Sequence, residues 1–286
     1  MLGRGVAALN PELQNAFNSI KNQLLAADIT LANLESPVTS APLVINHISD
    51  MGIGRLKLTN VDLRAQPTSL IALTSADIDL VSLANNHIND CGSQGIYDTH
   101  TALRNFGILP IGPEPIITYQ EIHGVRLAFL AYDSIKQQYE FGEFLHEVEE
   151  AVNKGAVTIV SVHWGYEYQS MPNLRQRELA QSLADSGAAL VWGHHPHVLQ
   201  PVEWIYSQKT RRKTLVIYSL GNALFDQYQH PDAQLSAGIS LSINSNGIHS
   251  LQGFPFIIHV WHGDVGFADN TTSLRIYDRL GITYIP

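Results

Sequence analysis

Apolar runs of strand length alternate with segments of helical spacing along the middle of the chain. Before Gly107, for example, Ile96, Leu103 and Phe106 recur at helical spacing, and the glycine is well placed to end that helix. Further helices are expected at 143–155 and 173–186. This alternation predicts an α/β protein with a layered sheet. Buried strands are expected at 77–87, 125–132, 156–165, 188–197 and 214–222.

The two ends of the chain follow other patterns. Alternating apolar and polar residues at 238–243 and 256–261 predict antiparallel strands. We find no internal repeat, low-complexity tract or linker, so we expect a single domain over residues 1–286. The N-terminal part is expected to contain a helix at 11–26 with Leu13, Phe17, Ile20 and Leu24 on one face, a strand at 28–35, a loop at 37–68 and a short helix at 69–76.

Composition and net charge exclude several classes of protein. Of the 286 residues, 45% are apolar, enough for a large buried core. The formal net charge of −9 argues against a nucleic-acid-binding groove, which needs a basic surface. The single cysteine, Cys91, excludes an intramolecular disulfide and a cysteine-rich zinc site. No apolar run approaches the roughly 18 residues that span a bilayer. No signal-peptide pattern opens the chain, so as written it is expected in the cytoplasm.

Side chains with metal-binding atoms follow four of the predicted strands. In open α/β sheets, ligands bind where the carboxyl ends of the strands converge. Imidazole, carboxylate and amide oxygen suit zinc, manganese or iron, and such a cation activates water for hydrolysis. The pattern therefore favours a metal-dependent hydrolase. The groups are Asn33 and Glu35, Asn86 and His87, His163, and the cluster of His194, His195 and His197.

Each of these groups also has an ordinary structural interpretation. A histidine at a strand end is often a surface or hydrogen-bonded residue, an Asn-Asn pair fits a turn, and Glu35 can simply begin a loop. Asp226 either supports the site or lies in a solvated turn, and Cys91 is either a nucleophile or a small buried side chain. The histidines without strand-end context are expected on the surface or in packing: His47, His100, His123, His146, His230, His259 and His262.

Five motifs resemble a known family in its own order along the chain. They resemble the CapA/PgsA-type family of capsule and poly-γ-glutamate synthesis, which belongs with the calcineurin-like metallophosphoesterases. The resemblance implies a four-layer α-β-β-α sandwich with a centre for two divalent ions, manganese, iron or zinc. The motifs are ANLESPVT (32–39), SLANNHINDCG (82–92), VHWGYEY (162–168), GHHPHVLQPVE (193–203) and YSLGNALFDQ (218–227).

The resemblance also implies roles for individual residues. Glu35 would bridge the two ions, and His197 would bind the second ion. His87 would protonate the leaving atom or steady the transition state. The coordination of the first ion would be completed by Asn86, His163 and His195. Surrounding or substrate-contacting positions would be Arg4, Asn33, Asn85, His194, Asn222 and Asp226.

One departure from the family pattern concerns the N-terminus. In the family, a first strand ending in Gly-Asp precedes a stretch similar to Met1–Arg4, and here the chain begins at that stretch. We therefore expect a domain that lacks its first strand and one aspartate ligand, which leaves the second ion short of protein ligands. A start codon assigned too far downstream would explain this, and a true truncation would weaken the protein.

Two functions follow from the resemblance. The first is a metal-dependent hydrolase acting on a small-molecule or polymer substrate, either a phosphoester or a γ-glutamyl or other cell-envelope polymer. The alternative is a non-catalytic accessory or binding subunit of a polymer-synthesis or export complex. An envelope location is expected if a signal or anchor precedes Met1.

Overall fold

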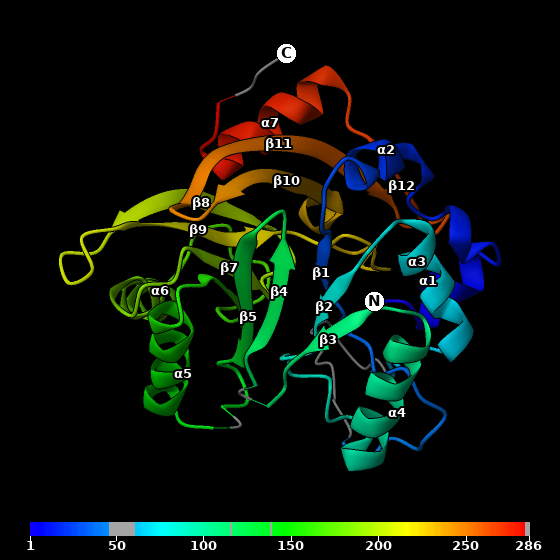
Figure 1. Cartoon of the computed structure of the whole chain (residues 1–286). Helices are drawn as coiled ribbons and strands as arrows, with labels where there is room; N and C mark the ends of the chain where they lie inside the picture. The colour runs from blue at the N-terminus through cyan, green and yellow to red at the C-terminus, as the bar shows by residue number, and fades with distance from the viewer. Residues whose placement is uncertain (46–60, 115, 138, 284–286) are drawn as a thin grey trace.

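The computed structural model describes residues 1–45, 61–114, 116–137 and 139–283, and these form an α/β protein with three sheets (Figure 1). The largest sheet has six strands. Its four central strands run parallel, and the two edge strands pair antiparallel to them. In spatial order the strands are β4 (Thr118–Ile122), β5 (Val125–Asp133), β6 (Val157–His163), β7 (Leu190–His194), β9 (Lys213–Leu220) and β8 (Leu199–Tyr206).

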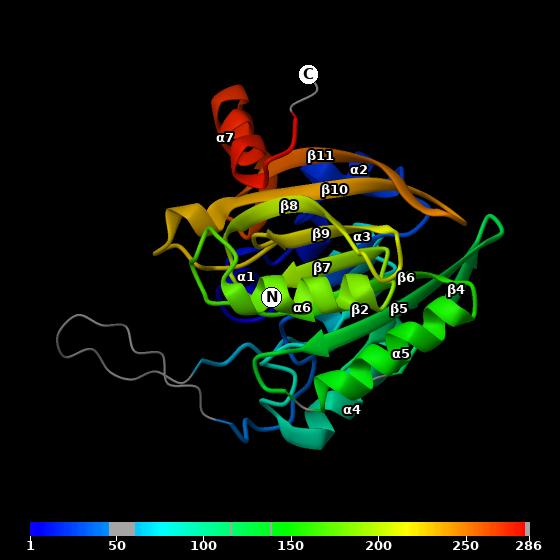
Figure 2. The ribbon, with the colours of Figure 1, turned by 90° about the vertical axis from the view of Figure 1, so that its left-hand side faces the viewer.

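Strand β5 is buried on both faces. Its alternate residues Ala128, Leu130 and Tyr132 pack against α5 (Phe141–Asn153) and α6 (Leu174–Asp185). Figure 2 shows these two helices lying over one face of the sheet. Residues of the opposite face of β5 share a core with β2, β3 and β10. The sheet therefore has helices on one side and strands on the other.

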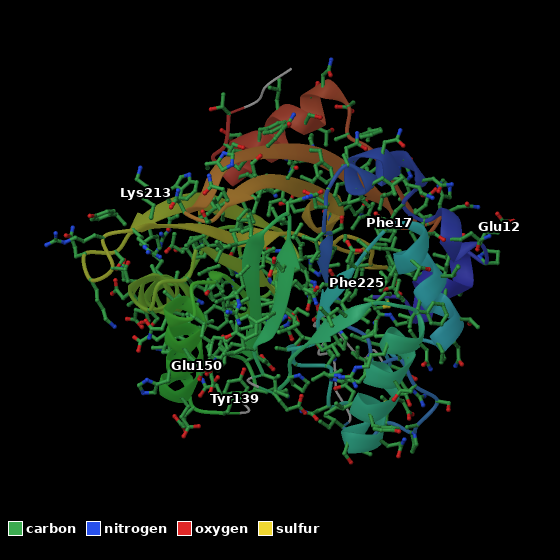
Figure 3. All side chains as sticks on the ribbon, viewed as in Figure 1. Glu12, Phe17, Tyr139, Glu150, Lys213 and Phe225 are labelled. Carbon is green, nitrogen blue, oxygen red and sulfur yellow. The ribbon has the colours of Figure 1, made fainter. Side chains whose placement is uncertain are left out.

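Two smaller sheets and five further helices complete the described part of the chain. Buried side chains such as those of Phe17 and Phe225 fill its interior, while Glu12 and Glu150 lie on the surface (Figure 3). The parallel sheet comprises β1 (Leu31–Asn33), β2 (Leu80–Ser82) and β3 (Leu109–Ile111), and the antiparallel sheet comprises β10 (Leu235–Asn244), β11 (Gly247–His259) and β12 (Asp264–Phe267). The helices are α1 (Arg4–Leu9), α2 (Lys21–Leu25), α3 (Ile71–Ser75), α4 (Gly92–Asn105) and α7 (Asn270–Leu280).

The predicted helix at 11–26 is wrong. The structure has two short 3-10 turns there, Leu13–Asn15 and Asn18–Ile20, followed by α2. The carbonyl of Ala16 accepts from Val265 N at 3.0 Å, and Ile20 N donates to the carbonyl of Phe17 instead. A contact with β12 therefore takes the acceptor that a continuous helix would use. Leu13, Phe17 and Ile20 are nevertheless buried, and Leu24 packs partly buried against the same core.

The predicted strands of the large sheet are confirmed, and their carboxyl ends meet. Strand β6 ends at His163, and β7 ends beside it at His194, its register partner. Strand β1 ends at Asn33, next to the end of β2. None of the helices in the described ranges has both the length and the apolar character needed to cross a membrane.

Candidate metal centre

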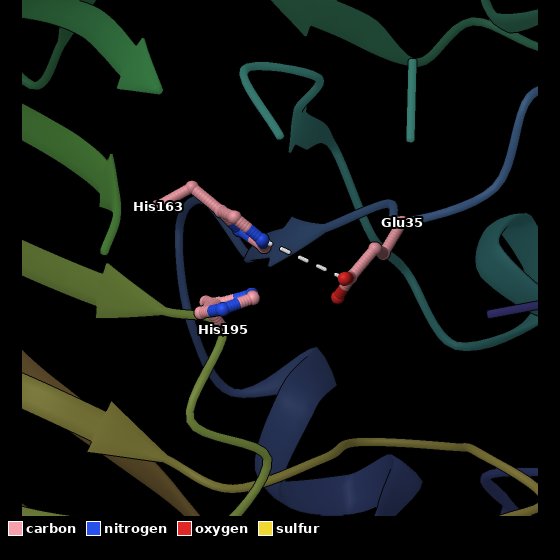
Figure 4. Close-up of side chains that lie close together, drawn as sticks. All are labelled: Glu35, His163 and His195. Atoms are coloured by element: carbon pink, nitrogen blue, oxygen red, sulfur yellow. Dashed lines mark ion pairs between the residues drawn. The ribbon is translucent and has the colours of Figure 1, made fainter. Parts of the chain in front are cut away.

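Three ligand-capable side chains from different elements converge at the strand ends. Glu35 follows β1, His163 ends β6, and His195 follows β7; one ligand atom from each lies within 4.8 Å of the others. Figure 4 shows the three side chains pointing toward one another. Glu35 Oε1 lies 3.5 Å from His163 Nε2. A buried carboxylate and two imidazoles therefore share one small volume.

The backbone after β7 is bent to present its histidines. His195 has φ of 96° and His197 φ of 59°, both in the left-handed region that side chains other than glycine rarely adopt. Between them, the carbonyl of Pro196 accepts a hydrogen bond from Tyr168 N at 2.8 Å. Such strain persists only where the surrounding structure enforces it, and it clusters at functional sites.

Two oxygen atoms face the same ring nitrogen of His163. Its Nε2 lies 2.8 Å from Asn86 Oδ1, within hydrogen-bonding distance, and 3.5 Å from Glu35 Oε1. The Glu35, Asn86 and His163 side chains are therefore close enough to bind one divalent cation if the cation takes the place of the hydrogen-bonded proton.

The protonation states also suit cation binding. Burial and the neighbouring His163 lower the pKa of His195 to about 3, so its ring is neutral at pH 7. Burial alone would raise the pKa of Glu35, but the His163 and His197 rings outweigh it and hold that pKa well below its usual range. Glu35 is therefore an anion and His195 a neutral ligand.

Two buried ring nitrogens lack protein partners. His163 Nδ1 and His195 Nδ1 make no hydrogen bond to any described residue. Most buried polar atoms are satisfied, so an unpartnered pair in one site calls for a ligand or for water. The donor set fits a divalent cation: Asn86 and Glu35 face Nε2 of His163, so a cation would bind that nitrogen, and water would be the partner of Nδ1.

A second group of ligand atoms adjoins the first and shares His195. It contains Glu167, His195 and His197, with ligand atoms again within 4.8 Å of one another. His197 Nδ1 lies 2.8 Å from Asn222 Oδ1, which leaves Nε2 available to a cation. Asn222 itself donates to Gln227 Oε1 at 3.0 Å and to the carbonyl of Ala233 at 3.2 Å, which fixes its amide orientation.

The sequence did not single out Glu167. The residue belongs to the motif VHWGYEY, but it lies four positions beyond the end of β6 in a segment without periodicity. Its neighbour Tyr168 stacks on His230 with ring centroids 3.7 Å apart, and Gln227 Nε2 donates to the Tyr168 hydroxyl. His230, expected as a surface or packing residue, therefore packs beside the centre.

His87 stands at the edge of the centre with a carboxylate behind it. Its Nδ1 lies 2.8 Å from Asp90 Oδ2, and Asp90 is fully buried. Burial lowers the pKa of His87, but Asp90 and Glu35 outweigh it and raise that pKa above its ordinary value. A cationic His87 can donate a proton.

Asn33, Asn85 and His194 have structural contacts. Asn85 Nδ2 donates to the carbonyl of Leu34 at 3.0 Å and approaches Asn33 Oδ1 at 3.4 Å, which ties the turn after β2 to the end of β1. His194 Nε2 contacts Ser161 Oγ at 3.1 Å. Among the described residues, His194 belongs to none of the side-chain groups that could hold an ion.

Arg4 and Asp226 form an ion pair close to the centre. Arg4 Nε donates to Asp226 Oδ2 at 2.8 Å, and the backbone N–H of Gly5 donates to the same oxygen at 2.9 Å. Arg4 is also 5.7 Å from the centre of the Phe225 ring. Asp226 is thus neutralised by Arg4 and holds α1 against the 218–227 segment.

A cavity of about 590 Å³ opens beside the histidines. Glu35, His194, His195 and His197 lie on its wall, and most of the remaining wall is apolar, including Trp192. The cavity gives space next to the ligand atoms for part of a substrate.

Comparison with known proteins places the chain among capsule synthesis proteins. It is 29% identical over 281 residues to the PGA biosynthesis protein CapA of Bacillus subtilis (strain 168), covering 91% of this chain and 70% of that protein. It is 30% identical over 234 residues to the capsule biosynthesis protein CapA of Bacillus anthracis, covering 74% of this chain and 54% of that protein. The chain thus spans little more than half of the second relative.

A solved structure shares the fold. The crystal structure of a hypothetical protein from Thermus thermophilus superposes with a TM-score of 0.52 at 14% identity, covering 88% of this chain and 94% of that chain. The family model of the bacterial capsule synthesis protein PGA_cap matches residues 1–227 and thereby all five motifs. The chain therefore belongs to the PGA_cap family of bacterial capsule synthesis proteins.

Proposed function

We propose that this protein is a metal-dependent hydrolase of capsule or poly-γ-glutamate synthesis. The observation that carries the proposal is the convergence of Glu35, His163 and His195, whose ligand atoms lie within 4.8 Å of one another. We further propose that the sheets and their covering helices form the four-layer α-β-β-α sandwich of the metallophosphoesterases. The core that β5 shares with β2 and β3, and the helices on its other face, support that architecture.

Each residue of the centre has a proposed task. Glu35, Asn86, His163 and His195 hold one divalent ion, and His197 with Glu167 holds a second. Glu167 supplies a carboxylate on the side where the sequence predicts a shortage of ligands. Bound divalent ions lower the pKa of water toward about 7 and supply a nucleophile.

The protein's own groups then direct the reaction. Glu35 contributes negative charge that fixes the position of the cations. His87, whose pKa is raised by Asp90 and Glu35, donates a proton from its ring to the leaving atom as the bond breaks. The Asn222 amide holds His197 in the tautomer that leaves Nε2 free.

The substrate is proposed as a phosphoester or a γ-glutamyl or other envelope polymer. Both curated relatives are named for capsule or PGA biosynthesis, and this supports a polymer of the cell envelope. The cavity of about 590 Å³ accommodates only part of a polymer, so cleavage would take place on a chain end or an extended segment.

The test compares metal content with turnover in three variants. Metal analysis and hydrolysis of bis(p-nitrophenyl) phosphate and of a γ-glutamyl oligomer are measured for His163→Ala, His195→Ala and His87→Ala. We expect the first two variants to lose bound manganese or zinc, and His87→Ala to keep it while turnover falls by about 10²–10⁴-fold. His146→Ala, on the exposed face of α5, serves as the control.

Two results would contradict the proposal. Equal metal content in all variants would show that His163 and His195 are not metal ligands. The other result is that the unsubstituted chain and His87→Ala both bind metal tightly and neither turns over either substrate. This would instead favour a binding subunit of a polymer-synthesis complex.

A further inference from the structure

A third group of ligand atoms lies on the hairpin that joins β11 to β12. It contains His259, His262 and Asp264, with one ligand atom from each within 4.8 Å of the others. His259 and Asp264 side chains are 40% and 39% exposed, and His262 is exposed, so solvent ions reach them. All three residues lie outside the range 1–227 matched by the family model.

Strand pairing sets the first two ligands side by side. His259 is the last residue of β11 and pairs in register with Asp264, the first residue of β12. His259 Nδ1 lies 2.9 Å from Asp264 Oδ1. Two ligands of one ion at right angles are about 3.0 Å apart, so the pair already has the spacing of adjacent ligands.

The His259 ring is held in place by a glycine on the opposite strand. A Cβ added to Gly266 would lie 2.5 Å from His259 Cε1 and 2.9 Å from Nε2. The ring therefore packs directly over the β12 backbone, in space that any other residue would fill. Its orientation toward Asp264 is fixed by packing as well as by the hydrogen bond.

The turn itself is anchored, so His262 returns to the same side. The N–H groups of His262 and Gly263 both donate to the carbonyl of His259, at 2.8 and 3.0 Å. Asn10 Nδ2 donates to the carbonyl of Gly263 at 3.0 Å, which ties the turn to the residue that follows α1. The His259 and His262 ring centroids are 5.9 Å apart.

We propose that His259, His262 and Asp264 bind one zinc ion or a similar borderline divalent cation. Two imidazoles and a carboxylate are a ligand set for such ions, and exposure leaves the remaining position to water. The bound cation would replace the shared proton between His259 and Asp264 and fasten the turn to both strands. The site uses none of the ligands of the candidate centre and does not depend on the proposed hydrolase function.

The turn also contacts a segment that follows the centre. Trp261, between the two histidines, lies with its ring 5.1 Å from that of Tyr228. Tyr228 N donates to the carbonyl of Asp226 at 3.0 Å. Zinc binding at the hairpin should therefore change the fluorescence of Trp261. Because Trp192 lies on the wall of the cavity beside the candidate centre, the signal of the hairpin is the part of the change that is lost in Trp261→Phe.

The experiment titrates the full chain with zinc alone and counts equivalents by calorimetry. We expect His262→Ala to bind one equivalent fewer than the unsubstituted chain, whatever number the candidate centre takes. Asp264→Asn keeps a neutral oxygen and should bind the hairpin equivalent more weakly or lose it. The part of the zinc-dependent fluorescence change that depends on Trp261 should vanish in His262→Ala. The control is His146→Ala, which removes another exposed histidine beside a carboxylate, Glu149.

The outcomes separate this site from the candidate centre. In His163→Ala, the zinc equivalent bound at the hairpin and the zinc-dependent change in Trp261 fluorescence should both be unchanged. An unchanged number of zinc equivalents in both His262→Ala and Asp264→Asn would overturn the proposal. Both side chains lie at the surface, so these variants should fold as the unsubstituted chain does.

Discussion

Replacing Asn222 tests whether the second ligand group binds a cation through a positioned His197. Asn222 Oδ1 contacts His197 Nδ1 at 2.8 Å, and the Asn222 side chain is only 7% exposed. In Asn222→Ala the His197 ring loses the partner that fixes its tautomer and rotation. Ring orientation by such a partner contributes about 10–100-fold to metal affinity, or about 1.4–2.8 kcal/mol.

Comparing Asn222→Ala with Asn222→Asp separates the loss of His197 orientation from a general loss of stability. Asn222 donates to Gln227 Oε1 and to the carbonyl of Ala233, and both bonds are lost in Asn222→Ala and in Asn222→Asp. Leaving these acceptors unpaired costs about 1–3 kcal/mol in Asn222→Ala, and Asn222→Asp loses more stability because a buried carboxylate oxygen then faces both acceptors. Only Asn222→Asp keeps an oxygen that accepts from His197.

The assay is competition for zinc or manganese between the protein and a chelator of known affinity. We expect the weaker-binding equivalent to lose about 10–100-fold in Asn222→Ala and to be preserved in Asn222→Asp. Asn246→Ala, at an exposed turn, controls for loss of a surface amide. Equal affinities in all variants, or equal losses in both Asn222 variants, would refute the assignment of His197.

Three further predictions concern stability. Gly193→Ala would place a Cβ 2.2 Å from both Trp164 Nε1 and the Tyr218 carbonyl, so chemical denaturation should show a loss of about 2–5 kcal/mol. Burial raises the pKa of Asp133 above its ordinary value despite His163, so the unfolding free energy should fall as pH rises from about 4 through that pKa; Asp133→Asn should flatten this profile. A divalent ion at 100 times its Kd should stabilise the fold by about 2.7 kcal/mol, seen as a rise in melting temperature that a chelator reverses and that is smaller in His163→Ala. An undiminished rise in His163→Ala would contradict the assigned ligand, and a flat pH profile would contradict the cost of burying Asp133.

The large sheet could be predicted because its signals are local. Runs such as VTIVSVH are apolar and β-branched and end in a polar residue, so β6 and its terminal His163 can be identified from the sequence. Asn173 likewise caps the N-terminus of α6, because its side chain accepts from Gln176 N. Both features depend on neighbouring residues only.

Features set by distant contacts could not be predicted. The position of Glu167 depends on the hydrogen bond between Tyr168 N and the Pro196 carbonyl, 28 residues further along the chain. The left-handed backbone at His195 and His197 has no signal in the residue types themselves. The same limit applies to 11–26, where apolar spacing indicated a helix but the hydrogen bond from Val265 N to the Ala16 carbonyl interrupts it.

Zinc-edge anomalous diffraction from a crystal soaked in zinc tests the central claim most directly. We expect an anomalous peak about 2.0–2.2 Å from a Glu35 carboxylate oxygen and from ring nitrogens of His163 and His195. No peak among these three side chains, or side chains directed into separate regions, would contradict it.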